Sequence, residues 1–191
     1  MEDSHLKPKI GVMGSAGDVL TESDRLRLSE IAEQMGKVIA ERGCVLITGA
    51  TTGLPDLVSR ASRRRGGLTI GISPAFSKEE HVNRYNLPTD GADVIIYTGF
   101  GLKGRNVINI RSSDIVIIFG GGMGALNEFT IAYDEGNVIG VLDGSGGIAD
   151  HIREIVEFAK KQTLSQLVFN SDPETLIDLC LHALSTRIKD A

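Results

Sequence analysis

Residues 113–128 of the chain, SDIVIIFGGGMGALNE, determine the fold that we predict. Five consecutive apolar residues at 115–119, mostly β-branched, are typical of a strand buried on both faces of a parallel sheet. A glycine cluster follows at once, and residues 125–133 are predicted to form a helix. A strand, a glycine-rich turn and a helix N-terminus present unpaired backbone N–H groups and the positive end of a helix dipole. The stretch therefore predicts an anion-binding turn, with the Glu128 carboxylate beside the bound group.

The same alternation of strand, glycine turn and helix extends in both directions from this stretch. The predicted strands are residues 9–14, 45–48, 68–72, 94–97, 115–119, 138–143 and 167–169. Helices are predicted between them, the first after a capping box at Thr21-x-x-Asp24 and the last from Pro173. This alternation predicts a Rossmann-like α/β fold, a doubly wound parallel sheet of about seven strands with helices on both faces. No repeat or linker interrupts the pattern, so residues 1–191 are expected to form one domain.

The composition excludes several classes of protein. A formal net charge of −5 argues against a general nucleic-acid-binding protein. No apolar run approaches the roughly 20 residues needed to span a bilayer, and the N-terminus is too polar for a signal peptide. Cys44 and Cys180 match neither a disulfide framework nor a zinc spacing, and the four histidines show no metal-ligand spacing. We therefore expect a cytoplasmic protein with reduced, buried thiols, no metal site, and no nucleic-acid or membrane partner.

The turns after the first, second, fourth and fifth predicted strands are all rich in glycine. In a doubly wound sheet, ligands bind beyond the carboxyl ends of the strands, where the strand order reverses. We therefore expect these turns to converge on one crevice, in which glycines let a phosphate approach the backbone closely. Residues 74–92 form a polar connection of unusual length, which is predicted to cover a site.

Two charged residues near these turns are candidates for chemistry. Arg105 follows a glycine turn at the start of a helix, where the dipole disfavours a cation, so it either reaches a ligand or is an ordinary solvated arginine. Glu128 could merely complement the dipole of its own helix. The glycine cluster beside Glu128 favours the functional interpretation.

A dinucleotide-binding site is the weaker alternative. Gly120-x-Gly122-x-x-Ala125 formally matches the dinucleotide fingerprint, and Asp143 lies near the spacing expected for a ribose-binding acid. That fingerprint normally follows the first strand of its unit, whereas here it follows the fifth. NAD binding would also leave Arg105 and Glu128 without a role.

Two motifs resemble those of a known family. Residues 120–128, GGGMGALNE, resemble the P-G-G-x-G-T-x-x-E signature of the lonely-guy proteins, long mislabelled lysine decarboxylases. Those proteins are phosphoribohydrolases that release a cytokinin base from its riboside 5′-monophosphate. Residues 98–106, TGFGLKGRN, are still more similar to the T-G-x-G-x-x-R-N pattern of a sister branch that includes the molybdenum-cofactor carrier proteins. The resemblance extends from the turn at Gly14 to the strand that ends at Asp143.

The resemblance and the glycine turns together assign the site. Arg105 and Glu128 are the catalytic candidates, Arg105 to orient a substrate and Glu128 to stabilise an oxocarbenium ion or activate water. The predicted ligand-binding residues are Gly14, Ser15, Gly49, Thr52, Gly53, Thr98, Gly99, Asn106, Gly120, Gly121, Gly122, Met123, Gly124 and Ala125.

Three departures from the hydrolase signature weigh against hydrolysis. Gly120 replaces a proline, Ala125 replaces a threonine and Asn106 replaces a lysine, and the loss of a hydroxyl and a cation should weaken phosphate binding by roughly a few kcal/mol. We therefore expect a protein that binds a small phosphorylated, nucleotide-like ligand or cofactor, such as the molybdenum cofactor. The alternative is a phosphoribohydrolase of nucleoside 5′-monophosphates. The resemblance also implies a homo-oligomer, a dimer or tetramer.

Overall fold

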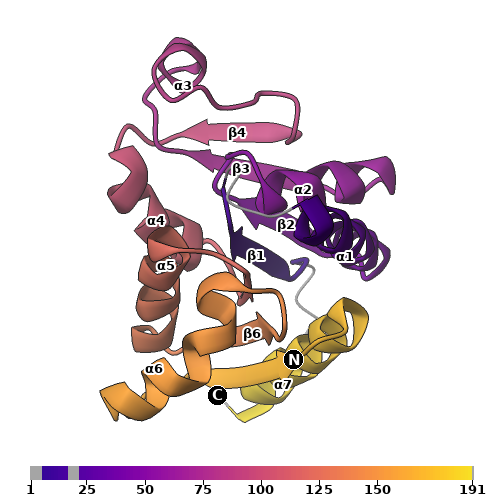
Figure 1. Cartoon of the computed structure of the whole chain (residues 1–191), viewed down its shortest axis with the longest axis vertical. Helices are drawn as coiled ribbons and strands as arrows, with labels where there is room; N and C mark the ends of the chain where they lie inside the picture. Colours follow the sequence, from indigo (N-terminus) through magenta and orange to yellow (C-terminus); the bar gives the residue numbers. More distant parts are fainter. Residues whose placement is uncertain (1–5, 17–21, 191) are drawn as a thin grey trace.

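A computed structural model describes residues 6–16 and 22–190, which fold around one parallel sheet (Figure 1). The seven strands lie in the order β4-β3-β2-β1-β5-β6-β7, and all neighbouring strands are parallel, as predicted. Their bounds are β1 Lys9–Gly14, β2 Val45–Thr48, β3 Thr69–Ser73, β4 Val94–Tyr97, β5 Ile115–Phe119, β6 Val138–Leu142 and β7 Gln166–Asn170. The predicted strands thus agree with the structure to within one residue at each end.

Seven α-helices and one 3-10 helix, η1, connect these strands in the described part of the chain. Their bounds are α1 Glu22–Glu41, α2 Leu54–Arg64, α3 Lys78–Asn83, α4 Gly101–Arg111, α5 Met123–Asp134, η1 Gly147–His151, α6 Ile152–Ala159 and α7 Pro173–Asp190. Helix α5 begins at Met123, two residues before the predicted start. The predicted capping residue Thr21 lies outside the described residues.

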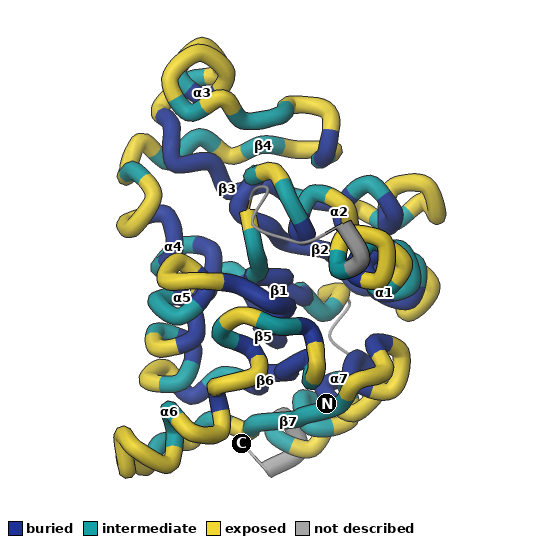
Figure 2. The backbone as a smooth tube through the Cα atoms, in the orientation of Figure 1, coloured by how far each residue is buried: buried dark blue, intermediate teal, exposed yellow. Residues whose placement is uncertain are grey.

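The core has two layers because the central strands alternate their side chains between the faces of the sheet. In β5, Ile115, Ile117 and Phe119 pack under α1, α2 and α7, whereas Val116 and Ile118 pack under α4, α5, η1 and α6. All five residues of β5 are buried. Figure 2 shows the same burial along the central strands, while the edge strand β4 is partly exposed. Helices therefore cover both faces of the sheet, as the apolar strand pattern predicted.

The strand order reverses beside β1, which pairs with β2 on one side and with β5 on the other. Gly14 and Phe119, the last residues of β1 and β5, lie opposite each other in this pairing. A Cβ atom at Gly14 would overlap the Phe119 carbonyl oxygen, so only glycine fits there. The turns that follow β1 and β5 are consequently neighbours at the reversal point.

The long connection 74–92 contains helix α3, which was not predicted from the sequence. His81 of α3 is fully buried, with Nδ1 2.8 Å from Ser73 Oγ and Nε2 2.9 Å from Pro88 O. These contacts hold the connection beside β4 at one edge of the sheet (Figure 1). No residue of 74–92 lines either of the two large cavities described below, so the segment does not cover them.

Cys44 and Cys180 are both free and buried, as predicted. Within residues 6–16 and 22–190, no helix is both long and apolar enough to cross a membrane. The same residues contain no group of three or more His, Cys, Asp or Glu side chains placed to hold a metal ion.

Candidate functional site

Two adjoining cavities open at the carboxyl end of the sheet, where the strand order reverses. The smaller, of about 170 Å³, lies against α4 and is lined by Val12, Met13, Gly14, Ala16, Gly49, Thr51, Pro55, Leu102, Lys103, Arg105, Asn106, Gly124, Ala125 and Glu128. The larger, of about 400 Å³, is lined by Gly14, Ser15, Ala16, Gly121, Gly122, Gly124, Ala125, Ser145 and Gly147. The turns after β1, β2 and β5 and the start of α4 thus converge, as the glycine pattern predicted. The loop after β6 also contributes, which was not predicted.

The glycine turn itself is built on two left-handed residues, Gly120 with φ 63° and Gly121 with φ 94°. A proline cannot adopt a positive φ, so the turn follows a path that the signature proline would forbid. The amides of these two glycines are already paired: Gly120 N–H donates to Ser145 Oγ at 2.9 Å and Gly121 N–H donates to Ser15 Oγ at 2.8 Å. The expectation that the Gly121 amide is free to hold the ligand is therefore wrong. Ser15 thus holds the turn in place through this hydrogen bond.

The N–H groups of Gly122, Met123, Gly124 and Ala125 remain available for a ligand. They belong to the N-cap and first turn of α5, which have no intrahelical acceptor, and no described residue accepts from them. Gly122 and Gly124 are exposed, and a Cβ atom at either would meet nothing within 4 Å. The backbone at these two glycines therefore borders open space.

Arg105 and Glu128 lie side by side in the wall of the smaller cavity, although 22 residues separate them in the chain. Arg105 Nη1 is 3.3 Å from Glu128 Oε1, and the two side chains are only 6% and 8% exposed. A Cβ atom at Gly49 would overlap the Arg105 guanidinium, so the glycine after β2 makes room for this arginine. Arg105 is thus not an ordinary solvated arginine. Glu128 lies in the second turn of α5, where the dipole has little effect.

Asparagine side chains of α4 complete the surroundings of Glu128. Asn109 Nδ2 donates to Glu128 Oε1 at 3.2 Å, and Asn109 is fully buried. With the Asn106 amide turned so that its nitrogen faces Glu128, Nδ2 lies 3.2 Å from the same Oε1. Asn109 was not among the predicted site residues. Its position one helical turn after Arg105 was the signal that could have identified it.

Two polar atoms in this group are buried without a partner among the described residues. Asn109 Oδ1 and Arg105 Nε have no hydrogen-bond partner among the described residues. Burial raises the pKa of the Glu128 carboxyl above its ordinary value, an effect that Arg105 and Asn109 oppose. Burial also lowers the pKa of Arg105, but a guanidinium stays protonated at any physiological pH. The smaller cavity therefore contains a carboxyl group that can exchange a proton beside a fixed cation.

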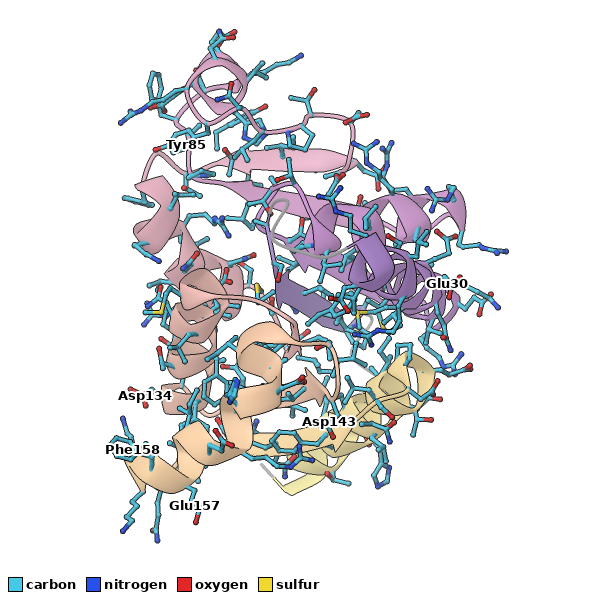
Figure 3. All side chains as sticks on the ribbon, viewed as in Figure 1. Glu30, Tyr85, Asp134, Asp143, Glu157 and Phe158 are labelled. Carbon is cyan, nitrogen blue, oxygen red and sulfur yellow. The ribbon has the colours of Figure 1, made fainter. Side chains whose placement is uncertain are left out.

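Six predicted ligand-binding residues line neither cavity: Thr52, Gly53, Thr98, Gly99, Gly120 and Met123. Thr98 Oγ1 donates to Ser73 O at 2.7 Å, and Gly99 N–H donates to Ala75 O, so both residues shape the turn before α4. Asp143, which Figure 3 labels, is the ribose-binding candidate of the dinucleotide alternative. Its carboxylate accepts from both terminal nitrogens of Arg153, at 2.6 and 3.1 Å. That carboxylate is not free for a ribose.

The chain matches the SLOG cluster4 family over residues 7–177. It belongs to this family. An uncharacterized protein of Archaeoglobus fulgidus is 37% identical to this chain over 134 residues. The match covers 70% of this chain and 79% of the relative. A cytokinin riboside 5′-monophosphate phosphoribohydrolase of Mycobacterium tuberculosis is 30% identical over 110 residues, only 57% of the chain and 56% of that protein.

A solved structure is also similar to this chain over most of its length. The molybdenum cofactor binding protein of the phototrophic bacterium Rippkaea orientalis is 32% identical to this chain, with a TM-score of 0.74. The superposition covers 95% of this chain and 99% of that one. The resemblance to lonely-guy proteins and to molybdenum-cofactor carriers is thereby confirmed.

Proposed function

We propose that this protein binds a phosphorylated, nucleotide-like ligand, with a phosphate on the first turn of α5. The observation that carries the proposal is the set of N–H groups from Gly122 to Ala125, which have no partner among the described residues. Gly124 and Ala125 line both cavities at the reversal of strand order. Backbone N–H groups and a helix dipole at such a position favour an anion. None of the three departures from the hydrolase signature removes these backbone N–H groups.

The molybdenum cofactor is one ligand of this chemical class. The neighbouring structure from Rippkaea orientalis is named for binding it, which supports the same class of ligand here. The residues fit the phosphate of such a cofactor, because Gly122 and Gly124 leave space that a Cβ atom would occupy. In this proposal the amides of Gly122 to Ala125 hold the phosphate. The residues of this protein take no part in chemistry at the molybdenum centre.

Gly124→Leu provides the sharpest test, because position 124 lines both cavities. Leucine favours the helix more than glycine does, and its Cβ meets nothing, so the variant should fold at least as stably. Calorimetric titration with phosphate, AMP, molybdate and molybdopterin should show binding of at least one compound to the wild type and none to the variant. A wild type that binds nothing in this panel would remove the proposal, and unchanged affinity in Gly124→Leu would place the ligand elsewhere.

A phosphoribohydrolase is the second candidate, favoured by the buried pair of Arg105 and Glu128 in the cavity wall. Glu128 could stabilise an oxocarbenium ion or activate water while Arg105 orients the substrate. The Mycobacterium tuberculosis relative carries this activity in its name, although the match spans about half of that protein. Incubation with AMP and with cytokinin riboside monophosphates should release free base, and Glu128→Gln should stop the release. Absence of free base at high enzyme concentration would leave ligand binding as the function.

A further inference from the structure

The buried carboxyl group of Glu128 uses only one of its two oxygen atoms for contacts with the described residues. Three donors from α4 lie near Oε1: Arg105 Nη1 at 3.3 Å, Asn109 Nδ2 at 3.2 Å and, with its amide turned, Asn106 Nδ2 at 3.2 Å. Oε2 has no hydrogen-bond partner among the described residues, although the side chain is only 8% exposed. Unlike Asn109 Oδ1, which also lacks a partner there, Oε2 is not fully enclosed. Because Glu128 lines the smaller cavity, this unpaired oxygen is left for a ligand.

The first turn of α5 would bring a bound anion close to this oxygen atom. Gly124 and Ala125 line the smaller cavity, and Glu128 follows them at the i+4 and i+3 spacings that place residues on one face of a helix. The cavity has a volume of only about 170 Å³, so a phosphate-sized group inside it leaves little room between itself and the walls. An anion held in this cavity by the amides of Gly124 and Ala125 would therefore be a neighbour of Glu128.

The charged groups of the smaller cavity balance a doubly charged anion only when Glu128 is neutral. Among the described lining residues, Lys103, Arg105 and Glu128 have ionisable side chains, whereas β1 and the loop after β2 contribute none. Two cations match two negative charges, and an ionised Glu128 would add a third negative charge beside the anion. Burial already raises the pKa of the Glu128 carboxyl, against the effects of Arg105, Asn109 and Lys103. A bound anion would raise this pKa further.

We propose that the anion binds together with one proton, which lies on Glu128 Oε2 and forms a hydrogen bond to the anion. The proposal depends on the proposed function, because it takes an anion at the first turn of α5 as its starting point. It goes further by giving Glu128 a role in binding, as a carboxylic acid that donates to the ligand. The proton comes from solvent, and Oε1 continues to accept from α4. Affinity for anions should consequently rise as the pH falls through the interval between the pKa of Glu128 in the free protein and its pKa in the complex.

Sulfate is a suitable probe, because it resembles phosphate but stays doubly charged from mildly acid to mildly alkaline pH. Calorimetric titration with sulfate in buffers of different ionisation enthalpy measures how many protons are taken up on binding. The wild type should take up as much as about one proton, and its affinity should rise by up to about tenfold for each unit of pH decrease within this interval. Gly124→Leu should lose the binding of sulfate, because position 124 lines both cavities.

Two glutamate variants complete the experiment. The amide nitrogen of Glu128→Gln can donate where the protonated Oε2 would, so this variant should bind sulfate without proton uptake and with an affinity that does not depend on pH. Glu157→Gln is the matched control, since Glu157 is exposed on α6, outside both cavities (Figure 3). This control should take up protons as the wild type does.

Sulfate binding whose enthalpy does not depend on the buffer would overturn the proton proposal while anion binding stands. Proton uptake that persists in Glu128→Gln would also overturn it, because the proton would then lie elsewhere. Binding of phosphate but not of sulfate would overturn it too, since it would indicate an ionised Glu128 that accepts a proton from the ligand. If neither anion binds, or if binding survives in Gly124→Leu, the proposed function fails together with the proton proposal.

Infrared spectroscopy of the wild type gives a second measurement that does not require any variant to fold. The absorption band of a protonated carboxyl group should grow when sulfate is added. An unchanged band in a sample saturated with sulfate would contradict the proposal.

Discussion

At the scale of single residues, Glu128 makes the stability of the protein depend on pH. Because burial raises its folded-state pKa, the folded chain holds this proton more tightly than the unfolded chain. Its contribution to the free energy of unfolding is therefore fully present below the unfolded pKa of about 4.3 and is lost as pH rises through the raised folded pKa. Relative to Glu128→Gln, which does not titrate, the wild type should lose free energy of unfolding with rising pH. Urea unfolding at several pH values between acid and neutral measures this difference, and the opposite slope would show that Arg105 outweighs burial.

The burial of Glu128 also determines how much its removal should cost. A carboxylate that merely lined a surface could become alanine without loss of stability. In the structure it is the partner of the buried Arg105, and removal of one member of a buried ion pair typically costs about 3–5 kcal/mol. Glu128→Ala should therefore unfold at markedly lower urea concentration. The double variant Arg105→Met/Glu128→Leu, which leaves no uncompensated charge, should recover most of the loss.

The buried side chain of Asn109 should lower the free energy of unfolding of the protein. Its Oδ1 is buried without a partner, and such a group typically costs about 1–3 kcal/mol. At acid pH, where Glu128 is neutral, Asn109→Leu should therefore be as stable as the wild type or more so. Asn106→Leu is the matched control, because the Asn106 amide, with its nitrogen facing Glu128, also donates to Leu102 O at 2.9 Å, and its loss should destabilise. Equal destabilisation by both substitutions in urea unfolding would contradict this prediction, because it would show that Asn109 stabilises the fold as Asn106 does.

The sequence singled out Arg105 and Glu128 as candidates, and the structure brings them together, but their surroundings were not predicted, for a physical reason. Both are charged residues beside glycine turns, and local preference alone makes such positions conspicuous. Asn109 and Ser145 contribute through contacts with residues 19 and 25 positions away in the chain, which no local pattern encodes. The pairing of the Gly121 amide with Ser15, across 106 positions, was hidden in the same way.

At the scale of elements, the loop after β6 supports the glycine turn after β5. Ile148 N–H donates to Gly121 O at 2.8 Å, and Ala149 N–H donates to Gly120 O at 3.1 Å. Gly147 lies directly against this turn, since a Cβ atom there would overlap the Gly121 carbonyl oxygen. The loop after β6 therefore fixes the backbone on which the proposed phosphate site depends.

Two glycines of this loop allow that support to be measured. Gly147 and Gly144 have φ of 58° and 71°, so alanine strains both positions by about 1–2 kcal/mol. Only Gly147→Ala also collides with Gly121, whereas a Cβ atom at Gly144 meets nothing within 4 Å. Gly147→Ala should be less stable than Gly144→Ala by roughly 1–3 kcal/mol and should bind phosphate more weakly. Indistinguishable melting temperatures and affinities would refute the supporting role.

Elements with a strong apolar period were predictable, and those without one were not. The central strands are continuous apolar runs because both faces are covered, so their positions followed from composition. Helix α3 has six residues, and His81 is its only buried one, so no apolar stripe marks it. The start of α5 was placed too late because Gly122 and Gly124 are poor helix formers, although the structure places one at the N-cap and one in the first turn.

At the scale of the whole molecule, we expect a homo-oligomer. Several large apolar side chains remain exposed on the described surface near the N-termini of α4 and α5, among them Phe100 at 67%, Leu102 at 51% and Met123 at 76%. Light scattering at micromolar concentration should give at least twice the chain mass of 20.4 kDa. Phe100→Asp should favour smaller species without unfolding, because aspartate suits the N-cap position that Phe100 occupies. A wild type that remains monomeric would refute the expectation.

The position of β1 between β2 and β5 has a consequence for how the chain folds. During synthesis β1 can pair early with β2, but its other edge waits until residue 119 has been made, because Met13 pairs with Ile118 and Gly14 with Phe119. Parallel pairings between such distant segments form slowly, since the intervening chain must first be ordered. The N-terminal third therefore spends this interval with an unpaired apolar edge, open to aggregation or chaperones. The proposed phosphate site does not exist until that edge closes, so a ligand bound there can stabilise the finished fold but cannot assist its first hundred residues.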